Sequence, residues 1–140
     1  MLSCNTTGNV WDDTTPPEQS AKIAFVNYEP TSYNGINVDK KQFRLVTLPA
    51  GTIDFSGDVN WSSQGYNVRY YFNAKDAVFS CRLEENEEYW AFVGYKPSDD
   101  KKSKIWGISL YKDTIKAKVG GPGDDKLVGF IPFNPPVISN

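Results

Sequence analysis

The chain has 140 residues, a mass of 15.7 kDa and a net charge of −2, which is the size of one domain with one core. A near balance of charge and a pI of about 5.1 leave no broad positive surface, so we expect no nucleic-acid partner. The sequence has no histidine. It therefore lacks the usual general base and the commonest nitrogen ligand for metals, and we expect no metal, no cofactor and no enzymatic activity. Aromatic residues make up 14% of the chain beside 11 Gly and 9 Pro, which favours an all-β fold.

The first 20 residues are predicted to be a polar, flexible tether. Cys4 follows Leu2 and Ser3, and the residues after it are mainly Asn, Thr, Asp and Pro. A cysteine preceded by an apolar and a small residue resembles the lipobox of bacterial lipoproteins, in which that cysteine becomes the lipidated N-terminus. The resemblance implies lipidation of Cys4 and a place in the bacterial cell envelope, with the lipid as the only membrane contact. A cysteine without modification in a disordered tail is the alternative.

The domain itself is expected over residues 21–133, where short apolar runs alternate with turn residues. Pro30 is expected to end the first strand, and the Asn34-Gly35 pair to form a tight turn. The clearest two-faced strand lies over residues 52–61, with its apolar side chains at alternate positions. The strands expected in this half are 22–28, 36–38, 43–48 and 52–61.

In the second half, residues 62–65 are expected to form a turn before another strand. Over residues 66–72, alternation points four side chains inward: Tyr66, Val68, Tyr70 and Phe72. Later strands are expected at 77–83, 89–95, 105–111, 114–119 and 127–131. The total of about eight or nine strands predicts a single antiparallel β-sandwich or barrel. Residues 134–140 are expected to form an extended, proline-stiffened tail.

A turn between two of these strands carries the sequence Leu48-Pro49-Ala50-Gly51. Pro49 presets the backbone for a turn, and Gly51 supplies a conformation that side chains resist. Together with the strand entry Glu87-Glu88-Tyr89-Trp90, this element resembles PEGA-type and related immunoglobulin-like β-sandwich modules of bacterial surface proteins and lipoproteins. The resemblance implies an extracytoplasmic scaffold and no particular activity.

The second cysteine, Cys81, alternates with Phe79 and Leu83 on one strand face. We therefore expect a buried thiol that packs as a small apolar residue. A disulfide between Cys4 and Cys81 is the alternative. A catalytic role is disfavoured because the chain has no histidine to activate the thiol.

The candidate binding face is a polar and aromatic strip on the strand that follows residue 65. Tyr71 lies on the face opposite Tyr70 and Phe72, and the same face carries Asn67, Arg69 and Asn73. Exposed aromatic faces with polar neighbours commonly hold sugars or partner proteins, so a glycan or an extracellular protein is the expected partner. A half-buried tyrosine without a ligand is the alternative. Three tryptophans within apolar runs are expected in the core: Trp61, Trp90 and Trp106.

Acidic residues gather in turns, and the lysines of residues 101–104 are balanced by two neighbouring aspartates. The spacing of a calcium-binding loop is absent, so solvated turns are expected. The acidic residues are Glu84, Glu85, Glu87 and Glu88, with pairs at 99–100 and 124–125. We predict a non-enzymatic binding or structural domain. The alternatives are a small glycan hydrolase or lyase with paired carboxylates, and a secreted inhibitor that presents residues 120–125.

Overall fold

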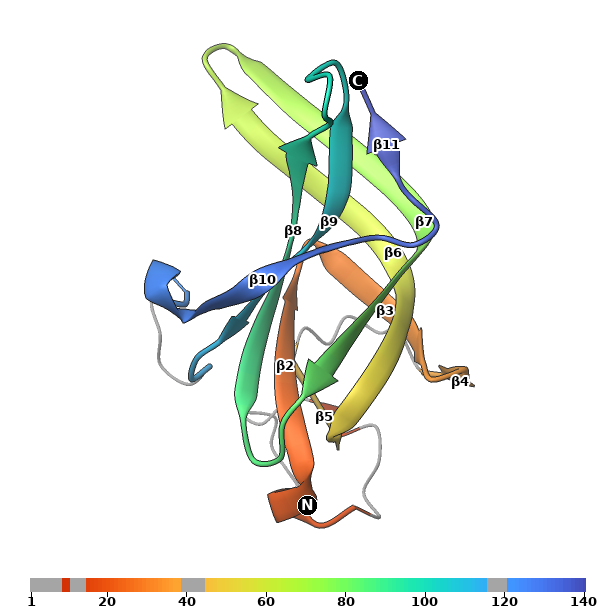
Figure 1. The fold of residues 1–140 in the computed structure, drawn as a ribbon, viewed down its shortest axis with the longest axis vertical. Helices are drawn as coiled ribbons and strands as arrows, with labels where there is room; N and C mark the ends of the chain where they lie inside the picture. The colour runs from red at the N-terminus through yellow and green to blue at the C-terminus, as the bar shows by residue number, and fades with distance from the viewer. Residues whose placement is uncertain (1–8, 11–14, 39–44, 116–120) are drawn as a thin grey trace.

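The computed structural model describes residues 9–10, 15–38, 45–115 and 121–140, and this part of the chain is all-β, as predicted. The strands form two open sheets that pack as a sandwich (Figure 1). The first sheet consists of β1 (Asn9–Val10), β2 (Ser20–Val26), β5 (Leu45–Pro49), β8 (Glu88–Pro97), β9 (Lys104–Lys112), β10 (Leu127–Pro132) and β11 (Ile138–Ser139). The second consists of β3 (Tyr28–Tyr33), β4 (Ile36–Asn37), β6 (Gly51–Gly65) and β7 (Val68–Leu83).

The tips of the two longest hairpins, β6–β7 and β8–β9, lie at the same end of the molecule (Figure 1). The first sheet runs β1-β5-β2-β8-β9-β10, with β11 also paired to β9, and the second runs β4-β3-β6-β7. Pairing is antiparallel except between β1 and β5 and between β2 and β8. Single turns of 3-10 helix at Pro17–Gln19 and Asp124–Lys126 precede β2 and β10.

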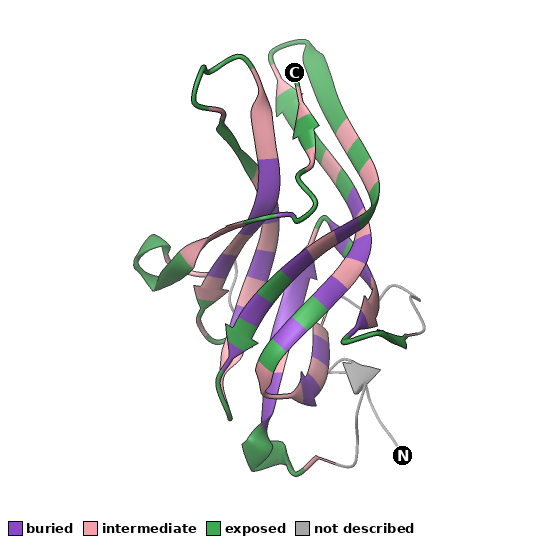
Figure 2. Ribbon diagram, turned by 45° about the vertical axis from the view of Figure 1, so that its right-hand side comes forward, coloured by how far each residue is buried: buried purple, intermediate pink, exposed green. Residues whose placement is uncertain are grey.

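The core lies between the sheets and is built from alternating strand positions (Figure 2). In β6, Ile53, Phe55 and Val59 are buried, as the two-faced pattern predicts. Phe55 stacks on Phe79 of β7 with ring centroids 5.2 Å apart. The facing sheet contributes the side chains Ala21, Ile23, Phe25, Val46, Leu48, Tyr89, Ala91, Val93, Trp106, Ile108 and Leu110.

The chain passes from the first sheet to the second at Asn27. This residue has a φ of 65°, a left-handed conformation that asparagine tolerates better than most residues. The prediction that Pro30 ends the first strand is wrong, because β2 already ends at Val26 and Pro30 lies inside β3. The ladder of β3 with β6 shifts register next to Pro30, and such an irregularity accommodates a residue without an amide hydrogen.

The predicted turn at residues 62–65 is also wrong. β6 continues through these residues to Gly65, and the chain turns at Tyr66 and Asn67, where Asn67 has a φ of 60°. β7 then runs to Leu83 with one irregularity near Asp76, where the register with β6 shifts, so two expected strands are one. The outer part of this hairpin diverges from the facing sheet, and its tip is exposed in Figure 2. The predicted burial of Tyr66, Val68 and Tyr70 therefore fails, since they are 92%, 46% and 56% exposed.

The segment 134–140, predicted to be extended, lies against the first sheet. Its β11 pairs with the start of β9, and Ser139 Oγ accepts a hydrogen bond of 2.7 Å from the Trp106 indole. The Asn134 amide donates to Val78 O at 2.8 Å, which joins the edges of the two sheets. Of the strand expected at 114–119, residues 114–115 are not in a strand, and 116–119 lie outside the described residues. Gly120 and residues 1–8 and 11–14 of the predicted tether also lie outside the described residues.

Candidate ligand groove

The four predicted binding residues lie on the outer part of the β6–β7 hairpin, and all four are exposed: Asn67, Arg69, Tyr71 and Asn73. Tyr71 has 68% of its surface exposed. Across the ladder, Arg69 faces Gln64, Tyr71 faces Ser62 and Asn73 faces Asn60. The Arg69 Nε donates to Gln64 Oε1 at 3.0 Å. This outer face is therefore polar with a single aromatic ring.

The opposite face of the same hairpin is aromatic and meets the end of the β8–β9 hairpin. Phe72 stacks on Trp106 with centroids 4.0 Å apart and planes within 5°. Trp61 approaches Trp106 edge-on at 5.0 Å, and Tyr95 lies 5.0 Å from Trp106 and 5.9 Å from Trp61. These contacts hold the projecting hairpin against β9.

Above this cluster the two hairpins and β11 enclose a groove of about 520 Å³. Tyr70 and Tyr95 remain 56% and 44% exposed, so their rings are open to a ligand. The Lys104 ammonium lies 5.4 Å from the Tyr95 ring centroid and donates to the Asn140 carbonyl oxygen at 2.9 Å. The residues that line the groove are Trp61, Ser63, Tyr70, Tyr71, Phe72, Tyr95, Lys104, Trp106, Ser139 and Asn140.

The prediction that three tryptophans lie in the core is confirmed only for Trp106, which is 2% exposed. Trp61 is half-buried at the side of the groove. Trp90 is half-buried as well, stacks on Phe92 at 5.9 Å and donates its indole N–H to Thr114 O at 3.2 Å. The sequence around Trp61 and Trp90 did not reveal that each strand has a partly open face at these positions.

Cys81 is a buried free thiol, as predicted. Burial raises the pKa of this thiol to about 12, so the reactive thiolate is scarce near neutral pH. Its predicted alternative partner, Cys4, lies outside the described residues.

The acidic turn between β7 and β8 lies at the opposite end of the molecule from the groove (Figure 1). Lys112 Nζ donates to Glu84 Oε1 at 2.8 Å, which lowers the pKa of Glu84 and raises that of Lys112. The Glu88 carboxylate accepts from the Ile115 amide at 2.8 Å. Among the described residues, no three His, Cys, Asp or Glu side chains are grouped in a way that could hold a metal ion.

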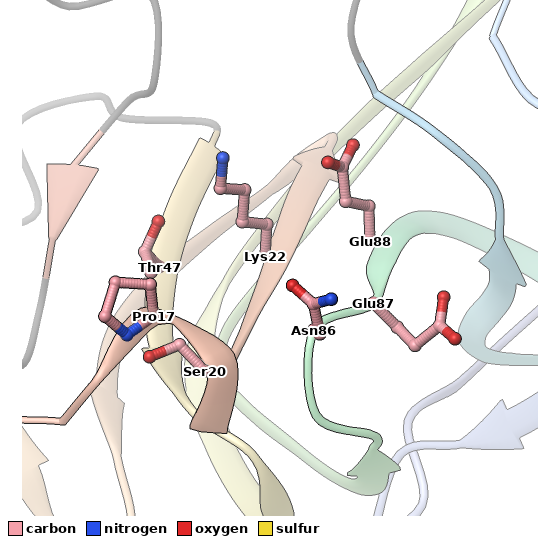
Figure 3. Close-up of a pocket in the computed structure, with 7 residues that line it drawn as sticks. All are labelled: Pro17, Ser20, Lys22, Thr47, Asn86, Glu87 and Glu88. Carbon is pink, nitrogen blue, oxygen red and sulfur yellow. The ribbon is translucent and has the colours of Figure 1, made fainter.

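A small cavity of about 110 Å³ lies beside this turn (Figure 3). The Lys22 ammonium and the Glu88 carboxylate point to the same side of it, whereas the Glu87 carboxylate points away. The cavity is much smaller than the groove, and it is lined by Pro17, Ser20, Lys22, Thr47, Asn86, Glu87 and Glu88.

The chain matches no protein-family model, no curated protein and no solved structure. Within the described ranges, no helix has the length and apolar character needed to span a bilayer. Function is therefore inferred from the residues of the groove.

Proposed function

We propose that this chain is a non-enzymatic binding module of the bacterial cell envelope and that the aromatic groove is its ligand site. The observation that carries the proposal is the pair of accessible rings, Tyr70 and Tyr95, above a packed aromatic floor. Concave sites with mostly apolar walls and a few polar groups are the usual form of a binding pocket. Ser63, Lys104 and Ser139 supply such polar groups here.

The composition of the groove favours binding over hydrolysis. A glycosidase of the usual kind needs two carboxyl groups that face the scissile bond. None of the residues that line the groove is an aspartate or a glutamate, and its charged side chain is Lys104. The Glu84–Glu88 turn lies at the other end of the molecule.

A lipid on Cys4 is the proposed anchor, and the position of the groove fits it. β2 begins at Ser20, at the end of the molecule farthest from the tips of the long hairpins (Figure 1). A membrane anchor that precedes Ser20 would leave the groove directed away from the bilayer. The resemblance of Leu2, Ser3 and Cys4 to a lipobox supports lipidation of Cys4.

The ligand site is tested with two matched tyrosine variants. An oligosaccharide array and a phage-displayed library of random linear peptides are the probes for the wild-type protein. For any ligand selected, we expect Tyr70→Ser to weaken binding by about tenfold or more, since an aromatic contact at the centre of a site is lost.

Tyr66→Ser is the control, because Tyr66 is 92% exposed at the hairpin tip and does not line the groove. It should leave both the affinity and the melting temperature unchanged. Equal binding by wild type and Tyr70→Ser would contradict the groove as the site.

The anchor is tested by the intact mass of the protein from the membrane fraction of its native host. A mass equal to the chain from Cys4 onward plus acyl groups is expected, and Cys4→Ser should release the protein into the soluble fraction. An unmodified Cys4 in the membrane fraction would contradict the proposed anchor and leave the groove unaffected.

A further inference from the structure

β7 has a free edge beside the groove. It is the last strand of its sheet, and only its β6 side is paired along Val68–Ala77 in the described part of the chain. The bond from the Asn134 amide to Val78 O joins this edge to the first sheet. Beyond Val78, toward the hairpin tip, half of the backbone groups of β7 point away from β6 toward open space.

The groove borders this edge directly. Side chains alternate between the two faces of a strand, yet three successive residues of β7 line the groove: Tyr70, Tyr71 and Phe72. Residues of both faces of a strand line a space that the strand edge borders, which fits the position of β7 at the end of its sheet. Ser139 of β11 and the following Asn140 border the groove from the other side, and the other edge of β11 pairs with β9. The groove therefore lies between two strand edges.

We propose that the groove accepts an extended polypeptide segment as an additional β-strand, hydrogen-bonded to the free edge of β7. This inference rests on the proposed function and names the ligand class of the same groove. Strand addition to a sheet edge is a recurring mode of peptide recognition, in which backbone bonds supply affinity and pockets for alternate side chains supply specificity. Every second side chain of the added strand would pack toward Tyr70, Phe72 and Trp106.

A peptide fits these observations better than a glycan does. A sugar would stack on the aromatic rings and bond to single backbone groups of β7, whereas an extended peptide presents donors and acceptors at the repeat of the strand edge. Exposed edges are usually protected by proline, by charge or by short length. Between Val68 and Asn73, β7 has no proline and one charged residue, Arg69, and it is rich in residues that favour strands.

The charge around the groove specifies the peptide further. Lys104 lines the groove, and none of the other lining residues is charged. Lys101 and Lys102 lie in the turn that precedes Lys104, where Asp99 and Asp100 offset them. The positive charge of Lys104 favours a strand with an acidic residue beside it, since complementary charge steers association.

The test uses peptides selected on the wild-type protein from the random linear library, each then synthesised with a single N-methyl group at successive backbone positions. N-methylation removes one amide donor and blocks one strand edge. We expect binding to fall by about tenfold at every second position and to change little at the positions between. Amide hydrogen exchange along Val68–Asn73 should slow at alternate residues when the peptide is bound.

The outcomes separate the inference from the proposed function. A peptide whose binding is insensitive to N-methylation, or unaffected by Tyr70→Ser, overturns the strand-addition inference. So does an oligosaccharide that binds in a Tyr70-dependent manner when no peptide does, although that result supports the proposed function. If no ligand of either class depends on Tyr70, both proposals fail.

Discussion

Cys81 and Tyr28 are titratable residues buried between the two sheets. Burial raises the pKa of the Cys81 thiol to about 12. Burial also raises the pKa of the Tyr28 hydroxyl far above its ordinary range, with smaller contributions from Asp58 and Cys81. Tyr28 keeps its proton in a bond of 2.7 Å to Ala77 O. Both groups therefore stabilise the fold in their neutral forms.

This burial predicts a loss of stability in alkali. A group with a raised pKa in the folded state contributes its stability fully below its unfolded pKa and loses it as the pH rises to the folded value. For Cys81 the window runs from about pH 8.5, where an unfolded thiol ionises, to about 12. The free energy of unfolding should fall within it by about 1.4 kcal/mol per pH unit from this residue alone.

Urea unfolding of wild type and Cys81→Ala over this window isolates the contribution, because all other groups titrate in both proteins. The variant should be less stable near neutral pH and should lose less stability as the pH rises. Parallel curves for the two proteins would contradict the assignment to Cys81.

At the scale of strands, the alternation of apolar and polar residues correctly predicted the segments that lie over the core. It failed for the segments that do not. Residues 52–61 and 77–83 follow the pattern because one face of each is covered by the facing sheet. Residues 62–65 are each small or polar, which is typical of a turn. They nevertheless pair with β7 beyond the reach of the core, where burial no longer selects apolar residues.

Only the part of the candidate site that lies on a single strand could be predicted from the sequence. The strip with Tyr71 follows from alternation within one strand, and the structure places it on an exposed face. The groove combines Tyr70 and Phe72 with residues from β8, β9 and β11. Trp106 and Ser139 are 33 positions apart in the sequence and are joined by a hydrogen bond. No periodic pattern indicates such a contact, because it depends on the order of strands in the sheet.

At the scale of the whole molecule, the groove results from the way the two sheets diverge. Their edges meet where the Asn134 amide bonds to Val78 O, and Phe133 is buried beside this junction. Beyond it the β6–β7 hairpin and the β8–β9 hairpin separate toward their tips (Figure 2), and β11 pairs with β9 beside the groove. One end of the sandwich is therefore open and aromatic, and the other carries the Glu84–Glu88 turn and the start of the domain.

The central claim, that this open end is the ligand site, is tested most directly by mapping backbone amide shifts in NMR spectra as a selected ligand is added. The account predicts that the largest shifts form one contiguous set over β6 and β7 near Trp61 and Phe72, β8 and β9 near Tyr95 and Trp106, and β11. Amides of the Glu84–Glu88 turn should not move. If the largest shifts occurred at that turn or around the Lys22 cavity, and the amides of the groove did not shift, the claim that the open end is the ligand site would be contradicted.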